Sequence, residues 1–197
     1  ENGDKIVEIG IVELNNHIPT KKYFHTYLNP EREVPEPAFK VHGLNYNFLK
    51  DKPLFASISD EMLEFIGEDK IIIHNSAFDL GFLNNELSLA KKTLIKPSQI
   101  IDTLTLAREL FPGSPASLDA LCRRYSINNS NRDLHGALLD SYLLAQVYLE
   151  LIGGSQPNFE LHNSKKDNYK NSTTDDDIDP KIFYQNKIFM SHLTEEE

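Results

Sequence analysis

The apolar run Lys70–His74, with the sequence KIIIH, constrains the fold of this chain most. Its three consecutive isoleucines leave no polar face, so the run predicts a short strand buried on both sides of its sheet. Asn75 and Ser76 follow and are residues that cap helices, and Ala77–Leu89 is then predicted as a helix.

Strands and helices are predicted throughout the first 154 residues. Lys5–Leu14 and Lys22–Leu28 predict two strands that form a hairpin around the turn Asn15–Thr20. Apolar spacing, with glycine or proline at the ends, predicts further helices at Ala38–His42, Asn47–Lys50, Ser57–Ile66, Thr103–Phe111, Ser117–Tyr125 and Gly136–Ile152.

Composition limits the classes of function. A formal net charge of −10 argues against a protein that grips long nucleic acid through a basic stripe. It remains compatible with an enzyme that holds a few terminal nucleotides through divalent cations, because such a site needs carboxylates. Cys122 is the single cysteine, so we expect no internal disulfide, a buried thiol and a cytoplasmic location. No apolar run is long enough for a membrane span.

Asp79 falls in the first turn of the helix that follows the KIIIH strand. The free amides and the dipole of a helix N-terminus favour a carboxylate there. By spacing alone, a purely stabilising role is the simpler interpretation. A functional carboxylate at the end of a buried strand is the alternative.

His135 and Asp140 form a second candidate pair. Positions five apart in a regular helix point about 140° away from each other. The two side chains therefore serve one site only if His135 lies on the loop before the helix, which Gly136 favours. His135 would then act as a general base and Asp140 would hold a metal ion. The alternative is a loop histidine and a solvated helix aspartate that share no site.

Several stretches resemble the epsilon subunit of bacterial DNA polymerase III, a family of DEDDh-type 3′→5′ proofreading exonucleases. They occur in the family's order between Gly3 and Gly154, and they read GDKIVEIGIVEL, AFKVHGL, IIHNSAFDLGFLNNEL, FPGSPASLDALCRRY and LHGALLDSYLLAQVYLEL. The FPGSPASLDALCRRY stretch is particular to this family, whereas the others carry generic exonuclease motifs.

The resemblance implies an α/β, RNase H-like fold with a mixed sheet flanked by helices, and hydrolysis of the 3′-terminal phosphodiester. It implies that Asp79 and Asp140 hold metal, that His135 activates the attacking water, and that His42 and Asp140 contact the terminal nucleotide. Asp102 is read as a supporting residue. The implied cofactors are two divalent cations, Mg²⁺ or Mn²⁺: one lowers the pKa of the water, and the other stabilises the leaving 3′ oxygen. The implied substrate is a single-stranded or frayed DNA 3′ end.

One family feature has no counterpart among the 197 residues: the first strand, which carries the metal ligands Asp-x-Glu. Glu8 and Glu13 do not match that motif. In the family's strand order the missing strand lies between Lys5–Leu14 and Lys70–His74, so both are expected to lose backbone partners. Either residues exist upstream or the gene product is broken. The 197 residues alone are expected to bind metal weakly and to be inactive.

The segments after the exonuclease domain, residues 1–154, have a different composition. Residues 155–180 are rich in Asn, Ser, Lys and Asp and predict a flexible linker. Within it, Gln156, Phe159 and Leu161 resemble a sliding-clamp-binding motif. Residues 181–197 are interpreted as a truncated segment that binds the polymerase catalytic subunit.

Two alternative functions remain open. The first is a related DEDDh exonuclease acting on RNA ends or short oligonucleotides. The second is a catalytically inactive fragment or scaffold that links polymerase to clamp, which the missing Asp-x-Glu would favour.

Overall fold

The computed structural model describes residues 4–130, 136–153 and 185–193, the last with a described side chain at Phe189 only. Within these residues the elements are, in chain order, β1 (Ile6–Asn15), β2 (Ile18–Tyr27), α1 (Glu36–His42), α2 (Tyr46–Leu49), α3 (Phe55–Ile66), β3 (Lys70–Ile73), α4 (Ser76–Leu89), a 3-10 turn (Pro97–Gln99), β4 (Ile100–Asp102), α5 (Thr103–Leu110), α6 (Leu118–Arg124), α7 (Ala137–Leu151) and β5 (Gln185–Leu193). No helix in this described part is long and apolar enough to cross a membrane.

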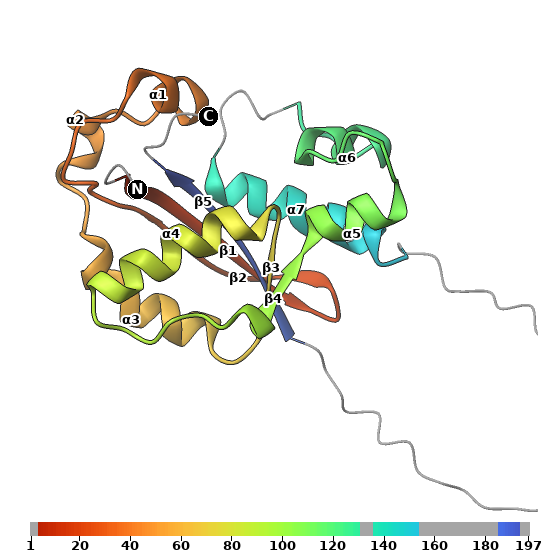
Figure 1. Ribbon diagram of the computed structural model, residues 1–197, viewed down its shortest axis with the longest axis horizontal. Helices are drawn as coiled ribbons and strands as arrows, with labels where there is room; N and C mark the ends of the chain where they lie inside the picture. Colours follow the sequence, from red (N-terminus) through yellow and green to blue (C-terminus); the bar gives the residue numbers. More distant parts are fainter. Residues whose placement is uncertain (1–3, 131–135, 154–184, 194–197) are drawn as a thin grey trace, which may run out of the picture.

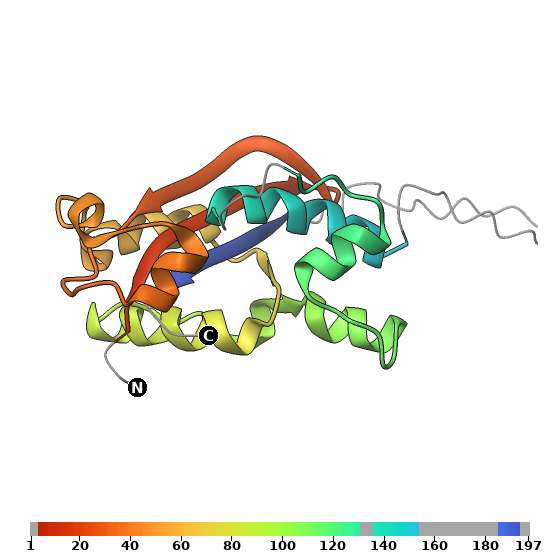
Figure 2. The same cartoon turned by 90° about the horizontal axis from the view of Figure 1, so that it is seen from above.

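The strands form one mixed sheet in the order β2-β1-β5-β3-β4 (Figure 1). β1 runs antiparallel to β2 and β5, whereas β3 runs parallel to β4 and β5. Buried residues of α3 and α4 share one apolar cluster and those of α7 belong to another, so these helices cover opposite faces of the sheet. Figure 2 shows α4 and α7 on opposite sides of β5. The α/β architecture predicted from the sequence is therefore present.

Burial of β3 on both faces is confirmed. Ile71 and Ile73 join the apolar cluster beneath α3 and α4, and Ile72 joins the cluster beneath α5, α6 and α7. All three side chains are fully buried. Complete burial of an isoleucine contributes roughly 1.5–3 kcal/mol, so this short strand ties both helical layers to the sheet.

The position between β1 and β3 is occupied by β5. Its residues pair with β1 from Asn15↔Gln185 to Ile6↔Leu193, and with β3 from Lys70↔Asn186 to Ile72↔Ile188. The expectation that β1 and β3 would lack backbone partners is therefore wrong. A vacant central position would leave two rows of amides and carbonyls without partners, and an extended segment from elsewhere in the chain satisfies both rows.

Most predicted elements agree with the structure to within a few residues, but two strands were not predicted. β4 has three residues and pairs with β3 alone, which is too short for a periodic pattern. β5 lies within residues 181–197, whose aromatic residues showed no clear period. The interpretation of that segment as polymerase-binding stays a prediction. Cys122 is buried as expected.

Candidate active site

The N-termini of α4 and α7 lie at the same level of the sheet, on opposite faces. Gly10 of β1 pairs with Met190 of β5, and Ile72 of β3 pairs with Ile188 two residues earlier in β5. β3 therefore ends close to the level of Gly10, where α4 begins (Figure 1). A Cβ atom on Gly10 would lie 2.5 Å from the Ala137 carbonyl carbon, so α7 begins directly over this residue.

Two of the predicted site residues lie at this level of the sheet, where α4 and α7 begin. Asp79 lies in the first turn of α4 and Asp140 in the first turn of α7. Their exposed fractions are 7% and 1%. Burying a carboxylate is unfavourable unless dipoles, hydrogen bonds or cations compensate, and a helix N-terminus supplies part of that compensation. The interpretation of Asp140 as a solvated helix residue is excluded by this burial.

Close contact between β1 and α7 fixes the position of Asp140. The buried Ser141 hydroxyl lies 2.9 Å from the Gly10 carbonyl oxygen and 2.8 Å from the Ala137 carbonyl oxygen. This contact requires glycine at position 10, because any Cβ atom there would collide with the backbone of the first turn of α7. Gly10 therefore sets the depth at which Asp140 sits.

Gly10→Ala is expected to lower the free energy of unfolding by about 1–3 kcal/mol, because the added methyl group overpacks the junction of β1 and α7. Gly81→Ala is a matched control. Gly81 lies within α4, where an added Cβ atom would meet no atom within 4 Å. That variant is expected to raise stability by about 0.5–1 kcal/mol. Urea denaturation of both variants checks the pair, and equal effects would contradict the proposed contact.

Asp102, at the end of β4, holds the start of α4 in place. One carboxylate oxygen accepts hydrogen bonds from the amides of Leu104 (2.9 Å) and Asn75 (3.2 Å). The other accepts from the amide (3.0 Å) and hydroxyl (2.9 Å) of Ser76. This carboxylate thus caps α5 and also binds the chain entering α4, where no side-chain cap from Asn75 forms. Asp102 is a positioning residue, in agreement with its predicted supporting role.

The same contacts shift the pKa of Asp102. Burial alone would raise it, but the Ser76 hydroxyl and the amides of Leu104, Ser76 and Asn75 all favour the carboxylate, and the net pKa lies below the ordinary 3.8. A lowered folded-state pKa means that the stabilisation is fully present above the unfolded-state pKa. It is lost as pH falls through the folded-state value.

Asp102→Ala is therefore expected to cost about 2 kcal/mol near neutral pH, since each of two helix N-termini loses about 1 kcal/mol of capping. The difference from the wild type is expected to shrink below about pH 4. Chemical denaturation of both proteins from pH 7 to pH 3 measures this difference in the free energy of unfolding. Asp60→Ala serves as a control, because its exposed ion pair with Lys92 contributes less than about 1 kcal/mol. A pH-independent difference for Asp102→Ala would refute the assignment.

His42 and His74, the two histidines within the resembling stretches that the structure describes, both have ring hydrogen bonds. His42, at the end of α1, is 5% exposed, and its Nδ1 accepts a hydrogen bond from the Leu44 amide at 3.0 Å. The neutral ring therefore carries its proton on Nε2 and can donate from that atom. His74 Nδ1 lies 2.9 Å from the Thr103 hydroxyl, which itself donates to the Ile73 carbonyl at 3.3 Å. His74 thus joins β3 to α5.

One buried carboxylate near the site, which pairs with a histidine, was not predicted. Glu8, 3% exposed, lies on the sheet face that α7 covers, two residues before Gly10, and therefore just beyond the first turn of α7. His25 Nε2 lies 2.8 Å from its Oε1, and the ring of Tyr27 packs against His25. Burial and the charge of Glu8 raise the pKa of Tyr27. The sequence signal for a buried Glu8 was strand alternation. Glu8, Val12 and Leu14 lie an even number of residues apart in β1, so they share one face, and Val12 and Leu14 place that face in the core.

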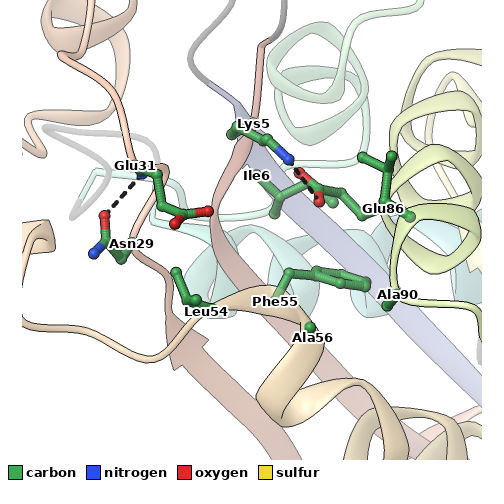
Figure 3. Close-up of a pocket in the computed structure, with 10 residues that line it drawn as sticks. Lys5, Ile6, Asn29, Glu31, Leu54, Phe55, Ala56, Glu86 and Ala90 are labelled. Atoms are coloured by element: carbon green, nitrogen blue, oxygen red, sulfur yellow. Dashed lines mark hydrogen bonds and ion pairs between the residues drawn. The ribbon is translucent and has the colours of Figure 1, made fainter.

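A pocket of about 160 Å³ opens between β1, α3 and α4, away from these residues. Leu54, Phe55 and Ile6 form its apolar wall (Figure 3). Lys5 Nζ and Glu86 Oε2, 3.1 Å apart, close its polar side. None of the predicted site residues lines this pocket.

Comparison with known proteins identifies the family. Residues 1–148 match the RNase_T family model, described as Exonuclease. The chain is 54% identical over 162 residues to DNA polymerase III subunit epsilon of Rickettsia conorii, which covers 81% of this chain and 70% of that protein. The chain is 50% identical over 155 residues to the Escherichia coli subunit, and the alignment covers 77% of this chain and 64% of that protein. The chain belongs to the DNA polymerase III epsilon family.

Solved structures agree with the fold of this epsilon-family chain. Exonuclease X, in complex with 5′ overhanging duplex DNA, aligns with a TM-score of 0.53 and 26% identity, over 73% of this chain and 82% of that one. The nuclease domain of 3′hExo, a DEDDh family member, aligns with a TM-score of 0.64 and 17% identity, over 75% of this chain and 80% of that one. The expected exonuclease fold is confirmed, and the chain is a nuclease by family.

DEDDh exonucleases generally use divalent metal ions, and the described donors fit such a site only in part. Asp79 and Asp140 are hard oxygen donors of the right kind. Within the described ranges, however, no group of three or more His, Cys, Asp or Glu residues is close enough to hold a metal ion. Two carboxylates are fewer than a pair of divalent ions requires, so the described part of this epsilon-family chain does not complete a metal centre.

Other predicted residues lie outside the described ranges. They are His135, and the clamp-motif residues Gln156, Phe159 and Leu161. Their roles stay predictions, as do the ligand roles of Asp79 and Asp140 and the nucleotide contact of His42.

Proposed function

We propose that this chain removes nucleotides from the 3′ end of DNA as the proofreading subunit of a replicative polymerase. The observation that carries the proposal is the arrangement of Asp79 and Asp140, buried in the first turns of two helices at one level of the sheet. The high identity to epsilon subunits spans the same region. The proposed partners are a DNA 3′ end, the polymerase catalytic subunit and, through Gln156, Phe159 and Leu161, the sliding clamp.

Each residue has a proposed role. His135 accepts a proton from the water that attacks the terminal phosphodiester. His42 donates from Nε2 to the bound nucleotide, a role that its neutral tautomer supports. Asp79 and Asp140 are ligands for Mg²⁺ or Mn²⁺, two ions per site. Because no three candidate ligands come together among the described residues, tight metal binding depends on further ligands.

The test uses protein expressed from its own gene, with its intact mass first compared with 22.5 kDa. A primer–template with a mispaired 3′ terminus is labelled at either primer end and incubated with Mg²⁺, Mn²⁺ or EDTA. We expect mononucleotide release from the 3′ end, dependent on the cation and faster from a mispaired than a paired terminus. Faster degradation of RNA of the same sequence would favour the alternative RNA exonuclease. Co-purification with polymerase without any trimming would favour the scaffold.

A further inference from the structure

An aromatic pair with a lysine lies where β2 ends. Tyr27, the last residue of β2, and Phe48 of α2 meet edge to face, with ring centroids 5.0 Å apart and 81° between the ring planes. Lys52 Nζ lies 4.3 Å from the Phe48 centroid and 5.9 Å from that of Tyr27. Phe48 is 43% exposed. We call these three residues the aromatic shelf.

The aromatic shelf lies at the same end of the sheet as the candidate active site. Tyr27 pairs with Glu8 across β1 and β2, on the face that α7 covers and just beyond the first turn of that helix. Phe48 belongs to the α1–α2 segment that also carries His42. Both views show α1 and α2 beside this end of the sheet (Figures 1 and 2).

The chemistry of the aromatic shelf suits a nucleotide. Proteins that hold single strands combine aromatic surfaces, on which bases stack, with cations that contact the phosphates. Lys52 keeps an ammonium group over an exposed ring despite the overall charge of −10. Lys50, two residues earlier, is also exposed. A cation above an aromatic ring is itself favourable by roughly 0.5–1 kcal/mol at an exposed site, so the group is held together before any ligand binds.

We propose that the aromatic shelf binds a nucleotide upstream of the terminal one in the single-stranded substrate. The base contacts the rings of Phe48 and Tyr27, and its phosphate contacts Lys52. This inference rests on the proposed function, because it extends the same substrate beyond the nucleotide that is cleaved. It predicts that a longer single-stranded oligonucleotide binds the protein more tightly, through residues that do not contact the terminal nucleotide.

The test is a fluorescence-anisotropy titration of the protein with a labelled oligothymidylate in Mg²⁺, with phosphorothioate linkages at its 3′ end so that the strand resists hydrolysis while the cations of the terminal site are present. Phe48→Leu retains an apolar side chain for folding but removes the aromatic face, and is expected to weaken binding about tenfold. Lys52→Gln is expected to reduce the slope of log affinity against log salt by about 0.7, the value for one contact to a single-strand phosphate. Thymidine 5′-monophosphate, used as a competitor, reports the terminal site and is expected to bind both variants as it binds the wild type.

Matched controls come from β2 itself. Tyr23→Leu removes an exposed aromatic ring about 13 Å along the strand from Tyr27, and Lys21→Gln removes an exposed lysine beside it. If Phe48→Leu and Lys52→Gln bind the oligonucleotide as these controls do, the aromatic shelf is refuted while the proposed function stands. If the wild type binds neither probe, the proposed function fails and the aromatic shelf fails with it.

Discussion

Hydrolysis of the 3′-terminal phosphodiester is expected to fall by about 10²–10⁴-fold when His135 is replaced by alanine. The reason is the loss of the group proposed to accept the proton of the attacking water. The free energy of unfolding is expected to change by less than about 0.5 kcal/mol, because the role proposed for this side chain is chemical and not structural. The measurement is single-turnover release of a 3′-labelled nucleotide, with protein expressed from its own gene.

Two comparisons separate a general base from a structural histidine. Added imidazole is expected to restore part of the activity of His135→Ala, because a small base can occupy the space of the missing ring. His17→Ala is the control. His17 packs on Tyr148, and its neighbours Asn15 and Ile18 pair at the far end of the β1–β2 ladder from Glu8 and Tyr27, so its loss is expected to leave hydrolysis unchanged. Near-normal hydrolysis by His135→Ala would refute the assignment.

Replacing Phe189 by alanine is expected to lower the free energy of unfolding by about 3–5 kcal/mol. Phe189 is fully buried in the cluster that contains Ile9, Ile71 and Leu83, so its removal leaves a cavity between β1, β3 and α4. Urea denaturation measures the change. Phe189→Leu, which fills most of the space, is expected to cost less and to keep the transition measurable if the alanine variant is too unstable.

The control for this second prediction is Phe39→Ala. Phe39 is 36% exposed on α1, so its truncation is expected to cost about 1 kcal/mol. If Phe189→Ala costs no more than Phe39→Ala, residues 185–193 do not form the central strand in solution. The wild-type sheet would then have to fill that position in another way.

Local patterns predicted much of the fold, because their causes are local. The KIIIH run and the β1–β2 hairpin were predictable from burial pattern and turn composition. β5 was not predictable, because its place depends on pairing with two strands that are far away in sequence. It pairs with β1, for example at Ile11, and with β3, for example at Ile72. The supporting role of Asp102 came from family resemblance, but its contacts with α4 were not predictable for the same reason. Asp102 binds Ser76 from 26 positions later, and the adjacent Asn75 adopts a left-handed conformation.

The candidate site was only partly predictable from residue spacing. The positions of Asp79 and Asp140 in first turns followed from helix limits, but their burial depends on Gly10 and on the central strand. Their proposed roles came from family resemblance. Glu8 was set aside because it matches no motif, although strand alternation places it on the buried face beside α7.

The central place of β5 also determines when the domain can fold. Ile11 and Phe189 are direct partners in the ladder but 189 − 11 = 178 residues apart in the chain. At about 5–20 residues per second, a ribosome needs roughly 9–36 s to synthesise that interval. From its own synthesis until then, each of β1 and β3 exposes an edge that can pair with other chains. The nascent nuclease is thus expected to depend on chaperones, and its sheet closes only after synthesis has reached β5.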